Sequence, residues 1–212
     1  MAATSPSRSA RLARIAIIVA GAASLSACGV NAIPTEQENA KAKWADVQSQ
    51  YQRRSDLIPN LVATVKGYAK QEEDTLTKVT EARAKATSIQ ISSDDVTDPD
   101  KVAKFQAAQA ELSKGLGRLL ATTEAYPDLK SNQNFLALQS QLEGTENRIA
   151  VARRDYNEAV REYNVTIRTF PAVIAANVIY GAKPMVPFTA AAGAETAPSV
   201  SFDGPAAPKS GH

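Results

Sequence analysis

The single cysteine of this 212-residue chain has the surroundings of a lipid acceptor. It ends the run Leu25-Ser26-Ala27-Cys28, which resembles the bacterial lipobox. In that motif the small residues let the extended backbone enter a dedicated peptidase, and the thiol accepts a diacylglyceryl group. An exported cysteine without a disulfide partner would otherwise be a free, reactive thiol. We therefore expect Cys28 to be lipidated.

The residues before Cys28 have the pattern of an export signal. They carry three arginines at positions 8, 11 and 14 and continue into an apolar stretch over residues 15–20, which is too short to be a comfortable transmembrane span. The sequence predicts a lipoprotein signal peptide over residues 1–27 and a short tether over residues 28–34. An uncleaved N-terminal anchor is the alternative.

Residues for the familiar kinds of catalysis and metal binding are scarce. The only histidine is His212, so neither histidine-dependent catalysis nor the Glu-x-x-His pairs of a carboxylate-bridged metal site is expected. The formal net charge is only +2 and aromatic residues make up 6%, which argues against a nucleic-acid partner. We expect a non-enzymatic protein with no catalytic residues, no metal and no cofactor.

Two groups of polar residues are candidate contacts for a partner or ligand. The first surrounds Pro59, whose missing N–H leaves the Ser55 carbonyl without its helical donor. It consists of Arg53, Arg54, Asp56 and Asn60. In one interpretation Asn60 or a water satisfies the kink, and the arginines pair with acidic residues on a neighbouring helix. In the other, the kink forms a polar notch that binds a partner's carboxylate or a lipid phosphate.

The second group consists of Arg153 and Arg154, followed by Asp155. These residues lie on the flank of a regular apolar stripe, and the same two interpretations apply to them. Interhelical ion pairs are the first expectation and ligand contacts the second.

Helical periodicity dominates the remainder of the chain. Thr35 and Glu38 have the spacing of a capping box, which predicts a first helix that begins near Glu36 and extends to about Ser88. A kink or break is expected between Arg54 and Pro59. Asp98 and the proline that follows it predict the start of a second helix, which runs to about residue 125.

A third helix is predicted from Ser131, with a coiled-coil-like seam of steps of three and four from Phe135 to Phe170. We expect this seam to pack antiparallel on the first helix of the same chain, in a monomeric bundle; a homotypic coiled coil is the alternative. Residues 172–180 predict a short apolar fourth helix with Gly181 as its C′ residue. Residues 182–212, rich in proline and alanine, are expected to be a disordered tail in which Met185 and Phe188 could lie on the bundle.

From Trp44 onward the sequence resembles the LemA family of bacterial membrane-associated helical proteins. The matching stretches are QRRSDLIPNLV at 52–62, VKGY at 65–68, EAYPDLK at 124–130, NF at 134–135, EGTENRI at 143–149, ARRDYN at 152–157 and TFP at 169–171. The resemblance implies an all-α bundle of long antiparallel helices over residues 35–181. It also implies a bundle beyond the cytoplasmic membrane and no established enzyme activity. The lipobox and the tail from residue 190 depart from the common family pattern.

The sequence thus predicts a lipid-anchored cell-envelope protein that faces the periplasm from the inner or the outer membrane. Its expected role is that of a scaffold or adaptor for other envelope proteins. The alternative is a lipid-binding or lipid-handling module, in which residues 172–180 open from the bundle or enter the membrane interface. The lack of charges within that segment argues against simple interfacial binding.

Overall fold

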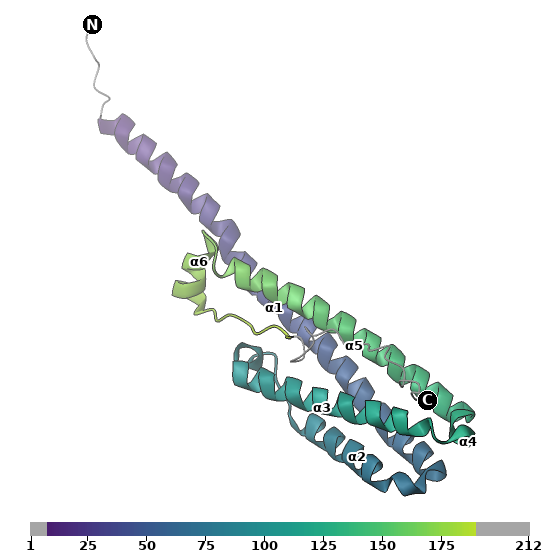
Figure 1. Ribbon diagram of the computed structural model, residues 1–212. Coiled ribbons are helices and arrows are strands. Elements are labelled where there is room, and N and C mark those ends of the chain that lie inside the picture. The colour runs from purple at the N-terminus through teal and green to yellow at the C-terminus, as the bar shows by residue number, and fades with distance from the viewer. Residues whose placement is uncertain (1–7, 190–212) are drawn as a thin grey trace, which may run out of the picture.

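The computed structural model describes the backbone of residues 8–189 and the side chains of residues 30–189. Over this part of the chain the fold is all-α, which confirms the predicted fold class (Figure 1). The α-helices are α1 (Arg8–Tyr68), α2 (Glu73–Ser88), α3 (Pro99–Thr123), α4 (Pro127–Lys130), α5 (Gln133–Thr166) and α6 (Ala172–Ala175). Short 3-10 turns are η1 (Lys70–Glu72) and η2 (Asp95–Thr97), and the π-helical segment η3 (Ala176–Tyr180) continues α6.

Helices α1 and α5 form the long antiparallel pair that the seam predicts (Figure 1). The direction follows from the cross-helix contacts, in which residue numbers rise on α1 as they fall on α5. These contacts join Gln50 to Arg148, Arg54 to Glu146 and Tyr68 to Asn132. Most seam positions from Phe135 to Tyr163 are buried. The prediction is wrong at Phe170, which is 81% exposed because α5 has already ended at Thr166.

The predicted start of the first helix near Glu36 is wrong, because α1 begins at Arg8. The Thr35 hydroxyl donates to the carbonyl of Asn31 at 2.9 Å inside the helix, so Thr35 is not an N-cap. Ile33 is fully buried in the bundle, and its packing fixes the helical path at this point. Residues 28–34, predicted as a tether, therefore belong to α1.

Of the kink or break predicted near Pro59, a break is not found. Helix α1 continues through Pro59, and the chain turns at Ala69 instead, where the backbone leaves the helical region with φ −126° and ψ 61°. Ala69 is buried in the core, which holds this turn against the bundle. The single first helix of the sequence prediction is thus two elements, α1 and α2, that pack on each other.

The predicted start of the second helix is confirmed. The Asp98 carboxylate accepts hydrogen bonds from the backbone N–H groups of Asp100 and Lys101, so it is the N-cap of α3. Asn132 caps α5 in the same way through the N–H of Phe135.

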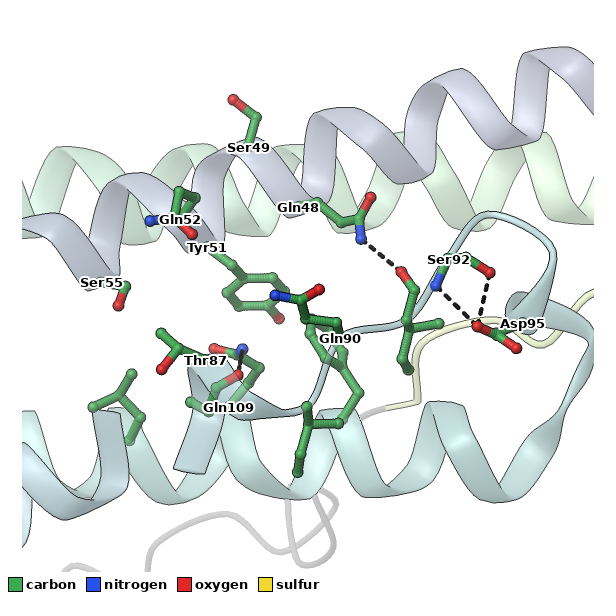
Figure 2. Close-up of a pocket in the computed structure, with 15 residues that line it drawn as sticks. Gln48, Ser49, Tyr51, Gln52, Ser55, Thr87, Gln90, Ser92, Asp95 and Gln109 are labelled. Atoms are coloured by element: carbon green, nitrogen blue, oxygen red, sulfur yellow. Dashed lines mark hydrogen bonds between the residues drawn. The ribbon is translucent and has the colours of Figure 1, made fainter. Parts of the chain in front are cut away.

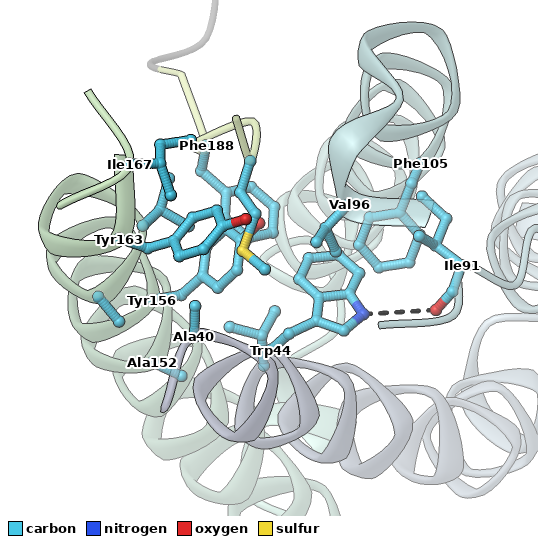
Figure 3. Close-up of a cluster of buried hydrophobic side chains, with 14 of the residues drawn as sticks. Ala40, Trp44, Ile91, Val96, Phe105, Ala152, Tyr156, Tyr163, Ile167 and Phe188 are labelled. Carbon is cyan, nitrogen blue, oxygen red and sulfur yellow. Dashed lines mark hydrogen bonds between the residues drawn. The ribbon is translucent and has the colours of Figure 1, made fainter. Parts of the chain in front are cut away.

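Two apolar clusters make up the core. Figure 3 shows the first, in which the Trp44 ring lies 5.4 Å from Phe105, 5.3 Å from Tyr156 and 5.7 Å from Phe188, measured between ring centroids. The Trp44 indole N–H donates to the carbonyl of Ile91. The second cluster lies at the opposite end of the bundle and includes Leu61, Val79, Leu112, Leu116 and Phe135.

The chain after α6 packs on the bundle farther than predicted. Gly181 has φ +55° and ends the η3 segment, as its C′ assignment predicts. Met185 and Phe188, expected to lie on the bundle, are buried in the first cluster. Both N–H and C=O of Met185 bond to the side chain of Asn164, and those of Phe188 bond to Asn157. The packed region extends to Thr189 rather than ending at Gly181, because paired asparagine amides satisfy this extended backbone. Residues 190–212 lie outside the described residues.

Candidate functional site

A layer of buried polar residues separates the two apolar clusters. We call Arg54, Ser55 and Gln109 the polar layer; each is less than a tenth exposed. Arg54 lies on the buried stripe of α1, three residues after Tyr51 and four before Ile58. Gln109 lies on the buried stripe of α3, four residues after Phe105 and three before Leu112. Each helix therefore contributes a polar residue at the same level of the bundle.

Arg54 is the centre of this layer. Its guanidinium donates to Gln109 Oε1 at 2.6 Å and to the Ser113 hydroxyl at 2.7 Å, both on α3. It also donates to Glu146 Oε1 on α5 at 2.9 Å. The Arg54 side chain is only 1% exposed, so these charge-assisted bonds form largely out of water. Arg54 thus joins α1, α3 and α5 in one network. Its ion pair with Glu146 is the predicted pairing with an acidic residue on a neighbouring helix.

The Ser55 carbonyl, which lacks its helical donor because of Pro59, has a different partner from the one expected. The Ser55 carbonyl accepts a hydrogen bond of 2.8 Å from Nε of Arg83 on α2. Asn60, the predicted partner, is exposed. Asp56 is also exposed and accepts a hydrogen bond from Gln52 one turn earlier. A donor from another helix therefore replaces the helical N–H that Pro59 lacks.

Two cavities adjoin the polar layer. The larger, of about 640 Å³, lies between α1, α3 and the segment that follows α2 (Figure 2). We call it the glutamine cavity, because its lining includes Gln48, Gln52, Gln90 and Gln109. The second, of about 440 Å³, lies between α1, α3 and α5, and we call it the arginine cavity after Arg54 and Arg153. Tyr51 and Gln109 line both cavities and so form the wall between them.

The buried polar atoms without a hydrogen-bond partner all belong to residues that line these cavities. Among the described side chains they are Nε of Arg54, Oγ of Ser55 and Nε of Arg153. Ser55 lines the glutamine cavity, whereas Arg54 and Arg153 line the arginine cavity. Buried polar groups are nearly always satisfied by protein, water or a ligand. These atoms are therefore unpaired hydrogen-bonding groups buried behind the walls of the two cavities.

The charges of the arginine cavity suit an anion. Its ionisable lining residues are two arginines, one glutamate and Tyr51, which leaves one positive charge in excess. Burial raises the pKa of Tyr51, although Arg153 and Arg54 oppose this effect. Its hydroxyl is therefore a neutral donor at physiological pH. A carboxylate or phosphate could accept from both guanidinium groups.

The chain's own C-terminal segment forms part of the mouth of the arginine cavity. The Arg153 guanidinium lies 4.7 Å from the centre of the Phe188 ring and donates to the Thr189 carbonyl at 3.1 Å. The N–H and hydroxyl of Thr189 both lie within hydrogen-bond distance of Gln106 Oε1. Arg153 thus contacts the C-terminal segment rather than an acidic residue of a neighbouring helix.

The structure brings only some of the predicted contact residues together. Arg54 and Arg153 share the arginine cavity, whereas Arg53 and Arg154 are exposed and do not line it. Arg154 pairs with the adjacent Asp155 at 3.2 Å instead of with another helix. The side chain of Cys28 lies outside the described residues. Sequence reasoning missed the lining residues Tyr51, Gln106, Gln109, Ser113 and Glu146.

Two further findings concern membrane-spanning helices and metal-binding clusters. Within the described residues, no helix combines the length and apolar character needed to cross a bilayer. The same residues contain no group of three histidine, cysteine, aspartate or glutamate side chains placed to hold a metal ion.

Comparison with known proteins identifies relatives over most of the chain. A model of the LemA family matches residues 43–202. The chain is 27% identical over 157 residues to magnetosome protein MamQ 2 of Paramagnetospirillum magneticum and to magnetosome protein MamQ of Magnetospirillum gryphiswaldense. It is 26% identical over 140 residues to protein LemA of Metamycoplasma hominis. Each match covers 66% of this chain but only 58% to 60% of the relative's length, and none of these names denotes an enzyme.

Proposed function

Because the chain belongs to the LemA family, we propose that it is a membrane-associated, non-enzymatic envelope protein that serves as an adaptor for other envelope proteins. The observation that supports this role most is the arginine cavity. There, Arg54 and Arg153 line one open cavity and each keeps a buried Nε atom without a partner. An acidic side chain or a terminal carboxylate of a partner would pair with the excess positive charge of this cavity.

Helix α1 would hold this cavity at a fixed distance from the proposed attachment point, Cys28. It is unbroken from Arg8 to Tyr68, and Arg54 lies 26 residues after Cys28 (54 − 28). At ~1.5 Å per residue, the cavity would stand about 40 Å from Cys28 along the helix axis. An adaptor built in this way presents its binding site at a set distance from its anchor.

The attachment we propose is a lipid at Cys28, after removal of residues 1–27. A thioether-linked diacylglycerol, joined in many bacteria by an N-terminal acyl chain, gives stable anchoring because several chains act together. The bundle would then face the periplasm from the inner or outer membrane. MamQ is by name a magnetosome protein, so these relatives are consistent with attachment to a membrane.

Photocrosslinking in cells tests the adaptor role. Gln106 lies half-buried at the mouth of the arginine cavity, and Lys78 is exposed on α2 and lines neither cavity. Replacing each in turn by p-benzoylphenylalanine in the full-length protein should give a reproducible protein adduct at position 106 only. No adduct at position 106, or the same adducts at both positions, would contradict the proposal.

A second candidate is a lipid-binding module at the membrane surface. The exposed apolar side chains of α6 and η3 favour it. Phospholipid that co-purifies with the protein after detergent exchange, in a constant molar ratio, would support this role over the adaptor.

A further inference from the structure

The segment from Phe170 to Tyr180 carries the most exposed apolar side chains of the described part of the bundle. Val178 is 80% exposed, Ile179 65% and Ile174 58%. Together with Phe170 and Tyr180 we call these residues the α6 platform. The opposite side of the same segment is buried through Ala172, Ala175 and Ala176. The platform therefore faces away from the bundle as an exposed, largely apolar surface that includes the exposed Asn177, and such a surface needs a partner or a membrane.

The platform lies at the level where α1 leaves the bundle (Figure 1). Helix α6 contacts α1, and its buried alanines belong to the same apolar cluster as Ile33. Val30 packs against this cluster. Ile33 follows Cys28 by five residues (33 − 28), or about 8 Å along the helix. The residues before Cys28 are the predicted signal peptide or anchor. Whether the chain is attached by a lipid at Cys28 or by an uncleaved N-terminal anchor, the bilayer surface would lie beside the platform.

The charges around the platform complement anionic lipid. Arg168 and Lys183 flank it and both are exposed. The sequence contains no aspartate or glutamate from Tyr163 to Thr189. Interfacial segments combine an apolar face with basic residues that reach the headgroups. The flanking cations supply the charges that are missing within residues 172–180.

We propose that the α6 platform inserts into the bilayer interface and gives the bundle a second point of membrane contact, with Arg168 and Lys183 at the level of the lipid phosphates. This inference rests on the membrane attachment proposed above. A single anchor would let the bundle tilt freely, whereas two contacts on one end fix its orientation. The occupant of the platform is thus the membrane that already holds the N-terminus, rather than another protein.

Quenching by brominated lipid tests this proposal. Full-length protein carrying Val178→Trp, with its N-terminal attachment intact, is placed in vesicles of phosphatidylglycerol and phosphatidylcholine whose phosphatidylcholine chains carry bromine. The matched control is Leu136→Trp, which is 49% exposed near the start of α5 at the opposite end of the bundle (Figure 1). The emission of Trp44, measured on the unsubstituted protein, is subtracted in both cases.

We expect about a twofold loss of the emission at position 178 and none at position 136, since only an indole in the interface meets the bromine atoms. Vesicle-bound protein without quenching at position 178 would overturn this inference and leave the attachment intact. Protein that does not float with the vesicles would overturn both. If the platform instead joined two copies of the chain, its emission would depend on the protein-to-lipid ratio and not on bromine, which would also refute the proposal.

Discussion

At the scale of the residue, the polar layer shows what the spacing of one helix can and cannot reveal. Trp44, Val47, Tyr51, Ile58 and Leu61 are buried on one stripe of α1. The gap between Tyr51 and Ile58 leaves Arg54 on that stripe, so its burial could have been predicted from the sequence. Its partners could not, because Gln109 and Glu146 lie 55 and 92 residues away.

Removing the acidic partner of Arg54 should destabilise the fold. Glu146→Ala leaves a buried guanidinium without its counter-charge, and we expect a loss of about 2 kcal/mol in the free energy of unfolding, measured by urea titration. The estimate is modest because the Glu146 side chain is 45% exposed. Glu143→Ala, also exposed and on the same helix, is the control and should change stability by less than about 0.5 kcal/mol. Equal effects of the two substitutions would show that the ion pair contributes nothing.

At the scale of the element, local rules predicted two helix ends correctly but failed at the Thr35 capping box and at the helix breaks. The N-cap at Asp98 and the C′ residue Gly181 follow from residue types alone. Pro59 obeys its local rule too, since it deprives the Ser55 carbonyl of a donor. The helix nevertheless continues, and Arg83 on α2 supplies a donor to that carbonyl. A tertiary contact of this kind has no signature in the sequence around Pro59.

The contact between Arg83 and Ser55 predicts a specific coupling. Arg83→Met removes the donor and should cost about 1 kcal/mol, since a half-buried carbonyl is left unpaired. In a Pro59→Ala background the new N–H of residue 59 can reach the same carbonyl, so the same substitution should cost much less. A double-mutant cycle of unfolding free energies measures this difference. Additive effects would mean that Arg83 does not replace the missing N–H.

At the scale of the whole molecule, the sequence predicted the antiparallel bundle but not the role of its C-terminal segment. The seam on α5 and its α1 partner follow from periodicity. The packing of residues 182–189 does not, because it depends on Asn157, Asn164 and Tyr156 meeting an irregular backbone. This segment contributes Phe188 to the core and Thr189 to the arginine cavity, so it is part of the fold and of the site.

The buried tyrosines predict a loss of stability at high pH. Burial raises the pKa of Tyr51, Tyr156 and Tyr163, and the Tyr156 hydroxyl also donates to the Val186 carbonyl. In the unfolded chain the tyrosine hydroxyls titrate at about pH 10. Above that pH the unfolded chain releases protons that the folded protein still holds, so stability should fall as pH rises. Urea midpoints from pH 8 to 11 measure the fall, which should be shallower in Tyr156→Phe; an unchanged slope would contradict this assignment.

The proposed lipid at Cys28 has a direct test in cells. Globomycin or Cys28→Ser should block maturation by signal peptidase II, and the mature protein should carry acyl mass on its N-terminal cysteine. Intact-mass spectrometry of the purified protein decides between this form and an uncleaved anchor. A mature chain that begins elsewhere without acyl mass would contradict the lipoprotein assignment.

If the arginine cavity holds an acidic group of a partner protein, two neighbouring arginines should differ in their effect on partner binding. Arg153 lines the cavity, whereas Arg154 is exposed and pairs with Asp155. Each is changed to glutamate in full-length protein with the photocrosslinker at position 106, after thermal melting has shown that both variants fold. We predict that Arg153→Glu abolishes the partner adduct and that Arg154→Glu preserves it. Equal adduct yields in the two variants would show that the arginine cavity does not hold the partner.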